Sequence, residues 1–257
     1  MSALDGRVAL VTGASRGVGR AIAGRLAADG AAVAVNYRRD DAAAAEVVSA
    51  IRAAGGRAAA YQAVIGDDRA VRAMTEAVRS ELGEIDILVS NAGTASRGRP
   101  VAETEPEEYL RLMTVHALGA IALIRSLLPA MRARSRADIV AVSSAITGHA
   151  PPNSAPYTMA KAALEMAART LAREERPHGI RVNVVAPGLV ATDMGERLVR
   201  AVDGRPLHEL DSGYPFGRVC LPEDVAAVVA FLVSADCGYV TGQRLVIDGG
   251  GPDLAIV

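Results

Sequence analysis

The sequence predicts an α/β fold, a three-layer doubly wound parallel sheet, and two observations support this prediction. Short apolar runs rich in Val, Ile and Ala alternate along the chain with helical patterns, which is typical of a parallel sheet covered by helices on both faces. A glycine-rich turn follows the first apolar run and leads into the first helical pattern. Because no repeat, linker or change in composition divides the chain, residues 1–257 are expected to form a single domain.

Each expected strand is a buried apolar run that ends in a turn. The strands are expected at residues 7–12, 32–37, 57–62, 86–90, 138–143, 180–185 and 244–247. The expected helices cover residues 41–54, 68–82, 103–134 and 157–176, after a first helix that contains Ile22 and Leu26 and ends at Asp29-Gly30. Right-handed crossovers between parallel strands place Gly13, Arg38 and Asn91 along one edge of the sheet, where ligands bind in such folds.

Charge and cysteine content exclude several classes of function. The 28 basic and 29 acidic residues give a net charge of −1, and since no basic face is visible, nucleic acid is not an expected partner. Cys220 and Cys237 have no CxxC or histidine spacing around them, so we expect free thiols and no metal site. The chain enters its first strand at once and has no uninterrupted apolar run of about 18 residues, so we expect no signal peptide, no membrane span and a cytoplasmic location.

The turn after the first strand reads Gly13-Ala-Ser15-Arg16-Gly17-Val18-Gly19. Between a strand and a helix, glycines allow a tight turn and a close approach of the backbone to a pyrophosphate, which then lies at the helix N-terminus. The spacing is GxxxGxG rather than GxGxxG. Its position in a strand–turn–helix unit nevertheless predicts a dinucleotide-binding loop.

Residues at the end of the second strand favour NADP(H) over NAD(H). An acidic residue at this point would bind the ribose hydroxyls of NAD, but the chain reads Asn36-Tyr37-Arg38-Arg39. Arginine side chains suit a 2′-phosphate, and Arg16 of the glycine loop belongs to the same predicted pocket. The alternative is that these arginines are ordinary surface charge.

Tyr157 and Lys161 lie four residues apart at the start of a predicted helix, so their side chains share one face. A free tyrosine has a pKa of about 10, and an adjacent cation favours the phenolate, which would make the phenol a usable acid or base. A nearby serine, Ser144, could hold a carbonyl or alcohol oxygen beside it. Lys161 is the only lysine in the chain, although a solvated ion-pair position on a surface helix remains the alternative.

Two long helices and one loop complete the expected organisation. Residues 115–128 of the first helix are apolar on nearly every face, and the helix over 157–176 is alanine-rich. A helix of this kind packs on the sheet with one side and on a partner with the other, so we expect a homo-oligomer. Residues 189–215 contain several glycines and a proline and are expected to form an irregular, mobile lid over the substrate.

The motifs described so far occur along the chain in the same order as in one family of enzymes. They are residues 12–19, Asn91-Ala92-Gly93, Ser144, Tyr157, Lys161 and Pro187-Gly188. On these residues, the chain from about residue 5 to residue 250 resembles the short-chain dehydrogenase/reductase (SDR) family, in the compact branch that includes the β-ketoacyl-carrier-protein reductases. The resemblance implies a Rossmann fold of about seven strands, usually assembled as a homotetramer, with a homodimer as the alternative.

The resemblance also implies a role for each matched residue. Tyr157 donates or accepts the proton, Lys161 lowers its pKa and binds the nicotinamide ribose, and Ser144 positions the substrate oxygen. The glycine motif and the family resemblance together predict the cofactor-binding residues. These are Gly13, Ser15, Arg16, Gly17, Val18, Gly19, Tyr37, Arg38, Arg39, Asn91, Ala92, Gly93, Tyr157, Lys161, Pro187, Gly188, Val190 and Thr192. Among them, Asn91 supports the adenosine side, while Val190 and Thr192 meet the carboxamide.

Three positions depart from the family pattern. The family usually carries in the long helix an asparagine that binds a water of the proton relay, but here the segment reads His116-Ala-Leu-Gly119. We expect a neutral imidazole that holds this water and titrates near pH ~6.5, with a histidine that only packs the helix as the alternative. Val64 replaces the polar residue that contacts adenine, Asp67 is expected to cap the next helix, and Ser90 replaces the first asparagine of Asn-Asn-Ala-Gly.

We therefore expect an NADPH-dependent carbonyl reductase that acts on a small or carrier-bound ketone. An alcohol, sugar or steroid dehydrogenase running in the oxidative direction has the same motifs. A non-catalytic NADP(H)-binding sensor or scaffold is a third hypothesis, while the spacing of Tyr157 and Lys161 disfavours an enoyl reductase. Candidate substrate contacts, which are as consistent with solvated loop positions, are His149, Asn153, Tyr214 and His208.

Overall fold

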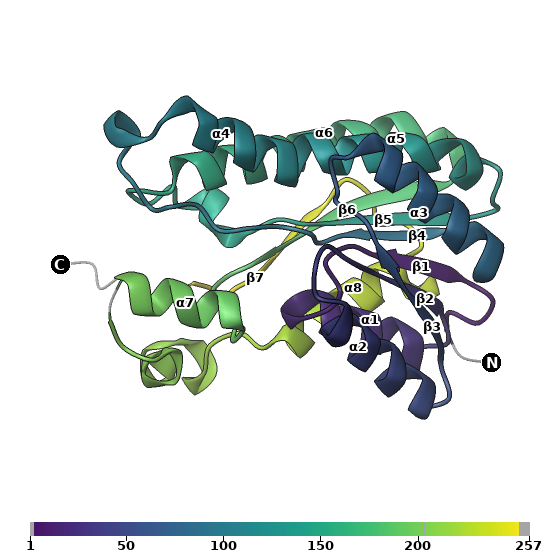
Figure 1. The fold of residues 1–257 in the computed structure, drawn as a ribbon, viewed down its shortest axis with the longest axis horizontal. Helices are drawn as coiled ribbons and strands as arrows, with labels where there is room; N and C mark the ends of the chain where they lie inside the picture. Colours follow the sequence, from purple (N-terminus) through teal and green to yellow (C-terminus); the bar gives the residue numbers. More distant parts are fainter. Residues whose placement is uncertain (1–2, 203, 252–257) are drawn as a thin grey trace.

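A seven-stranded sheet, parallel throughout, forms the centre of the computed structural model, which describes residues 3–202 and 204–251 (Figure 1). The strands are β1 Val8–Val11, β2 Ala32–Tyr37, β3 Arg57–Gln62, β4 Ile87–Ser90, β5 Ala137–Val142, β6 Ile180–Pro187 and β7 Arg244–Ile247. Their order is β3-β2-β1-β4-β5-β6-β7, which confirms the doubly wound Rossmann arrangement. Every residue of β1, β4, β5 and β6 is buried, as expected for strands covered on both faces.

Helices cover both faces of the sheet (Figure 1). One layer consists of α1 Gly17–Ala28, α2 Asp41–Ala53 and α8 Pro222–Val233, whose apolar side chains share one core cluster. The other layer consists of α3 Asp68–Glu81, α5 Gly119–Arg132 and α6 Ala155–Glu175, which share a second cluster. Alanine, valine, leucine and isoleucine fill both clusters, since the chain contains few aromatic residues.

Aspartates begin two of these helices. The carboxylate of Asp40 accepts a hydrogen bond from the Ala43 backbone N–H, and that of Asp67 accepts from the N–H groups of Arg69 and Ala70. These contacts satisfy backbone donors that have no partner inside the helix. The predicted capping role of Asp67 is confirmed.

The helix predicted over residues 103–134 is divided. A short 3₁₀ turn, η1 Val101–Glu103, precedes α4 Pro106–Met113, and a π turn, η2 Thr114–Leu118, joins α4 to α5. A π turn widens the helix by one residue and is often found at functional sites. This one carries His116.

The segment from Pro106 to Arg132 is also long and apolar enough to cross a membrane, with a mean hydropathy of 1.6 in its most apolar window. In the fold, Leu123, Leu127 and Met131 of this segment are buried in the core against the sheet. The outward side chains of Leu110, Leu118 and Ile121 are exposed in the single chain. The core helix of an α/β sandwich meets the same length and hydropathy criterion.

The expectation of an irregular segment over residues 189–215 is wrong for much of its length. Residues Asp193–Val202 form α7, which is followed by the 3₁₀ turns η5 Leu207–Gly213 and η6 Pro215–Gly217, while residue 203 lies outside the described residues. A small apolar cluster of Val199, Leu207 and Val219 holds these pieces together. The glycines of this segment therefore do not prevent helix formation.

Candidate active site

The glycine loop lies between β1 and α1, at the carboxyl edge of the sheet. Gly13 and Gly17 have φ angles of 63° and 53°, in the left-handed region that favours glycine. A Cβ atom on Gly19 would lie 2.4 Å from the Gly13 carbonyl oxygen, so no larger residue fits there. Ser15 is buried within the loop, and Val18 is half-buried in the first turn of α1.

Asn91, the first residue after β4, fastens this loop to the sheet. Its side-chain amide donates hydrogen bonds to the carbonyl oxygens of Thr12, at 2.9 Å, and Gly13, at 3.2 Å. In return, the Thr12 hydroxyl accepts from the backbone N–H groups of Asn91 and Ala92. Thr12 was not singled out from the sequence, although its place at the end of the first predicted strand was the available signal.

The basic residues after β2 lie beside the same loop. The Asn36 amide oxygen accepts from the Gly13 backbone N–H at 3.2 Å, and Arg16 forms a 2.5 Å ion pair with Asp40. Arg38 and Arg39 are exposed and Tyr37 is half-buried. The cations are thus near the loop, but part of the charge of Arg16 is already matched by Asp40.

Ser144 and Tyr157 bring two hydroxyl groups together. Ser144 follows β5 and caps the short 3₁₀ turn η3 Ala145–Gly148, while Tyr157 lies in the first turn of α6, as predicted. The Ser144 side chain lies close enough to the phenol of Tyr157 to lower its pKa. Burial has the larger effect and raises the pKa of Tyr157 to about 12.

The buried ammonium of Lys161 lies beneath this pair. Its Nζ donates a hydrogen bond of 2.7 Å to the Val142 carbonyl oxygen and is 5.8 Å from the centre of the Tyr157 ring. Burial lowers the pKa of Lys161 to about 8, against the opposing charge of Glu165. The expectation that Lys161 lowers the pKa of Tyr157 is not met in this structure, because desolvation of the phenol dominates.

His116 packs against the other side of the tyrosine ring. The two rings meet edge to face, and the Nε2 atom of His116 lies 2.8 Å from the Thr94 carbonyl oxygen. The Thr94 backbone N–H also lies 3.3 Å from Nε2. We assign the proton to Nε2 on the shorter contact, because a carbonyl can only accept, and this leaves Nδ1 as an acceptor. Nδ1 is a buried side-chain atom without a hydrogen-bond partner in the part of the chain that the structure describes.

The expected titration of His116 near neutral pH is wrong. The side chain is 2% exposed, and burial, followed by the positive charge of Lys161, lowers the pKa of His116 to about 3. The imidazole is therefore neutral near pH ~7. It can accept a hydrogen bond but cannot act as an acid.

Comparison with known proteins agrees with this geometry. The family model described as Enoyl-(Acyl carrier protein) reductase matches residues 13–251. Tetrahydroxynaphthalene reductase of Pyricularia oryzae is 40% identical over 261 residues, covering 97% of this chain and 90% of that protein. The chain belongs to the short-chain dehydrogenase/reductase family. It is an oxidoreductase of carbonyl or hydroxyl groups, and its family binds NAD(P)(H).

Two further SDR proteins are similar over nearly the whole chain. The 3-oxoacyl-(acyl-carrier-protein) reductase FabG of Haemophilus influenzae is 34% identical over 247 residues, which cover 96% of this chain and 98% of that protein. Among solved structures, the angucycline C-6 ketoreductase LanV with bound NADP has a TM-score of 0.87 at 38% identity and covers 96% of both chains. The family model is described by enoyl reduction, whereas these relatives are named reductases of ketone groups.

The loop after β6 lies next to the glycine loop. Gly188 donates its backbone N–H to the Ile247 carbonyl oxygen, and Val190 pairs with Cys220 in an isolated bridge. A Cβ atom on Gly17 would lie 3.2 Å from the Cγ2 atom of Thr192. This contact brings the segment after Pro187 against the glycine loop.

The glycine loop fits the dinucleotide that the family binds. A Cβ atom at Gly13 or Gly19 would contact Ala92 or Gly13 at 3.0 Å or less, so the loop must stay without side chains there. The N-terminus of α1 begins at Gly17, within the loop, and presents backbone N–H groups to an anion. Among residues 3–202 and 204–251, no three or more His, Cys, Asp or Glu side chains are grouped so that they could hold a metal ion.

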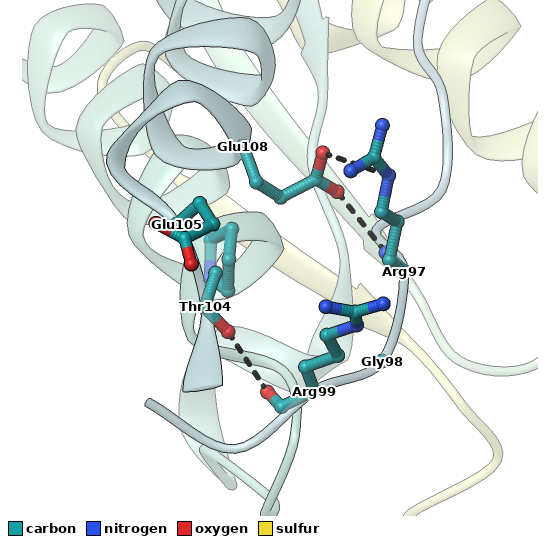
Figure 2. Close-up of a pocket in the computed structure, with 7 residues that line it drawn as sticks. Arg97, Gly98, Arg99, Thr104, Glu105 and Glu108 are labelled. Carbon is teal, nitrogen blue, oxygen red and sulfur yellow. Dashed lines mark hydrogen bonds and ion pairs between the residues drawn. The ribbon is translucent and has the colours of Figure 1, made fainter. Parts of the chain in front are cut away.

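The candidate substrate contacts lie in loops and in the segment after α7. His149, Asn153 and His208 are exposed, and Tyr214 packs against the small cluster beside α7. Figure 2 shows a small pocket that instead lies between the 97–105 segment and α6, next to Tyr157 in the chain. Its lining residues are Arg97, Gly98, Arg99, Thr104, Glu105, Glu108 and Pro156.

One buried carboxylate in this pocket holds the segment in place. Glu108, 5% exposed, accepts two hydrogen bonds from Arg111, at 2.7 and 2.8 Å, and one from the Arg97 backbone N–H. These bonds lower the pKa of Glu108. The segment that leads away from Gly93 is thereby fixed against α4.

Proposed function

We propose that the protein is an NADPH-dependent ketoreductase in which Tyr157 is the proton donor. The grouping of Ser144, Tyr157 and the buried ammonium of Lys161 supports this most strongly. Because the pKa of the phenol lies at about 12, Tyr157 carries its proton at neutral pH. A protonated donor suits reduction of a ketone, since the reverse reaction needs a base.

In this mechanism both hydroxyl groups bind the oxygen of the substrate carbonyl. Ser144 holds the oxygen in place, and Tyr157 donates the proton from Oη to that oxygen as the carbonyl carbon is reduced. NADPH, when bound, supplies the hydride. The Lys161 ammonium lies near the tyrosine ring, where it would hold the nicotinamide ribose beside the phenol.

The cofactor assignment rests on charge and on the shape of the loop. Ser15 and Val18 lie with the glycines along the pyrophosphate, and Arg16, Arg38 and Arg39 bind the 2′-phosphate beside Tyr37. The remaining predicted cofactor-binding residues, along the other strand ends, are Asn91, Ala92, Gly93, Pro187, Gly188, Val190 and Thr192. Two donors of Lys161 remain for the nicotinamide ribose, since one is bonded to Val142.

His116 is assigned to the route by which Tyr157 regains its proton. The unpartnered Nδ1 atom is buried, and an unpaired buried acceptor is unfavourable unless it is satisfied by solvent. A water bound there would link the neighbourhood of Lys161 to bulk solvent. In this role the neutral imidazole replaces the family's asparagine as an acceptor.

The proposal also covers the oligomeric state, the substrate lid and the cellular location of the protein. The exposed apolar side chains of Leu110, Leu118 and Ile121 on the α4–α5 segment and of Met159 and Met166 on α6 favour a homotetramer or homodimer through these helices. The chain acts as one domain, with residues 189–215 as the substrate lid. Its proposed location is the cytoplasm.

A substrate screen tests the function. Oxidation of NADPH and of NADH is followed with β-ketoacyl thioesters, cyclic ketones and quinones. We expect turnover of a ketone with a kcat/KM at least about 10-fold higher with NADPH, which corresponds to about 1.4 kcal/mol. Tight NADPH binding without turnover of any ketone would favour a sensor, and turnover of alcohols alone would favour a dehydrogenase.

A further inference from the structure

Glu165 lies on α6 one turn beyond Lys161 and two turns beyond Tyr157. Its carboxylate is not in contact with either residue but with the loop that carries Ser144. The Ser143 hydroxyl donates to Oε1 at 2.6 Å, and the Thr147 hydroxyl donates to the same oxygen at 2.9 Å. Both ends of the turn that follows β5 are thus bonded to one carboxylate.

Arg244 of β7 binds the other side of this carboxylate. Its Nε lies 3.0 Å from Oε2 of Glu165, and the side chains are 25% and 13% exposed. A terminal nitrogen of the same guanidinium donates to the Thr147 hydroxyl at 2.8 Å and to the Ser144 carbonyl oxygen at 3.3 Å. The position of Ser144 therefore depends on a residue 100 positions away in the sequence.

We propose that Glu165 and Arg244 are a positioning pair for the reaction: together they hold the turn that carries Ser144 against α6, next to Tyr157 and Lys161. This rests on the proposed function of Ser144, Tyr157 and Lys161. Neither residue of the pair touches the reacting atoms, so both act through these three side chains.

The charges around Lys161 explain why a carboxylate is needed. The groups that face it are Tyr157 and Glu165 from α6, His116 from η2 and the Val142 carbonyl from β5. Of these, Glu165 is the anion, and it opposes the loss of the proton that burial favours. Arg244 affects Lys161 through Glu165, because its positive charge is paired with that carboxylate.

The sign of the effect differs between the two partners. Glu165→Gln retains an oxygen that can accept from Ser143 and Thr147 but removes the negative charge, so the pKa of Lys161 should fall. Arg244→Met leaves the carboxylate without its cation, so the pKa of Lys161 should rise. If the pair were only structural, both variants would be less stable, but the Lys161 pKa would not shift in opposite directions.

The lone lysine makes this measurable without an assay of turnover. In protein labelled at the lysine side chain with ¹³C, Lys161 gives the single lysine signal, since the chain has no other lysine. Titration by NMR should show the Lys161 pKa about one unit lower in Glu165→Gln and higher in Arg244→Met than in the wild type. The matched control is Glu175→Gln, which breaks the 2.5 Å pair of Glu175 with Arg132 on the same helix and should lower the thermal midpoint without moving the Lys161 pKa.

Kinetics supply the second arm. With NADPH and a ketone, Glu165→Gln should lower kcat about 10-fold or more and shift the alkaline limb of the kcat profile to lower pH, with the KM for NADPH changed less than about three-fold. Arg244→Lys keeps a positive charge but loses the guanidinium hydrogen bond to the Ser144 carbonyl oxygen. It should therefore lower kcat without moving the alkaline limb of the kcat profile. Unchanged Lys161 titration in both Glu165→Gln and Arg244→Met would overturn the inference. If the Lys161 pKa shifts as predicted but the protein reduces no ketone, the result would support the Glu165–Arg244 pair and contradict the proposed function.

Discussion

The imidazole of His116 meets the ring of Tyr157 edge to face, with 5.1 Å between the ring centres and 84° between the planes. This contact places the π turn of the long helix directly against the proposed proton donor. Gly93 completes the arrangement, since a Cβ atom there would lie 2.7 Å from Cε1 of His116. The orientation of Tyr157 therefore depends on a histidine that is itself held by the backbone around Gly93.

Gly93→Ala should displace the imidazole and with it the tyrosine ring. We expect a loss of about 1–3 kcal/mol in the free energy of unfolding, as for other overpacked sites, together with a fall in kcat. Gly24→Ala on α1 is the control, because no atom lies within 4 Å of its added Cβ, and it should be neutral or stabilising. Urea denaturation and steady-state kinetics compare the two. Equal stability of both variants would show that His116 is free to move.

His116→Asn should change how stability depends on pH. The pKa of His116 is about 3 in the folded protein and about 6.5 in the unfolded chain. The unfolded chain thus binds the proton first as the pH falls, and the stability that is complete above pH ~6.5 is lost toward pH ~3, by at most about 1.4 kcal/mol per unit. Between pH 7 and pH 5, the free energy of unfolding should therefore fall less in the variant than in the wild type. Parallel losses would mean that His116 is not buried as a neutral group.

The same variant tests the proton route. If the Nδ1 atom holds the relay water, His116→Asn should alter the pH–rate profile of ketone reduction, since the bond to that water changes. An unchanged profile would remove His116 from the path and leave it a packing role only.

The arginines after β2 should decide the cofactor preference. Arg38→Gln and Arg39→Gln should each raise the KM for NADPH about 10-fold, because a hydrogen bond to a charged group contributes about 1.5–3 kcal/mol. The KM for NADH should stay within about two-fold, since NADH lacks the 2′-phosphate. Arg72→Gln, at an exposed position of α3, is the control. Equal increases for both cofactors would assign these arginines to the surface.

Lys161→Arg should lose most of the activity although it keeps a positive charge. Lys161 is 4% exposed and binds a backbone carbonyl of β5, so the wider planar guanidinium does not fit the same place. We expect kcat to fall about 100-fold or more, in a protein whose circular dichroism spectrum is unchanged. Turnover equal to that of the wild type would mean that any cation suffices.

Local patterns predicted most of the fold. The bounds of β2, β3 and β7 agree with the expected strands, because apolar and β-branched runs between turns mark buried strands directly. The π turn at His116 was not predicted, because the contacts of His116 with Thr94 and Tyr157 join residues far apart in the sequence. The helix α8 was missed, although Pro222 at its first position and the apolar run after it were available signals.

The sequence predicted which side chains make up the candidate site, but not their electrostatics. Ser144, Tyr157 and Lys161 follow from short motifs that sequence spacing fixes. The raised pKa of Tyr157 and the lowered pKa of His116 depend on burial, which no local pattern gives. The pairing of Glu165 with Arg244 joins residues 79 positions apart, and only the folded sheet brings them together.

The central claim is that the Tyr157 hydroxyl donates the proton, and Tyr157→Phe tests it most directly. The substitution removes Oη but keeps the ring that packs against His116, so the fold and the cofactor site should be retained. NADPH titration by fluorescence should give a Kd within about three-fold of the wild type, while kcat for ketone reduction falls about 10²–10⁴-fold, the usual contribution of a general acid. Ketone turnover close to that of the wild type, with NADPH bound normally, would contradict the account.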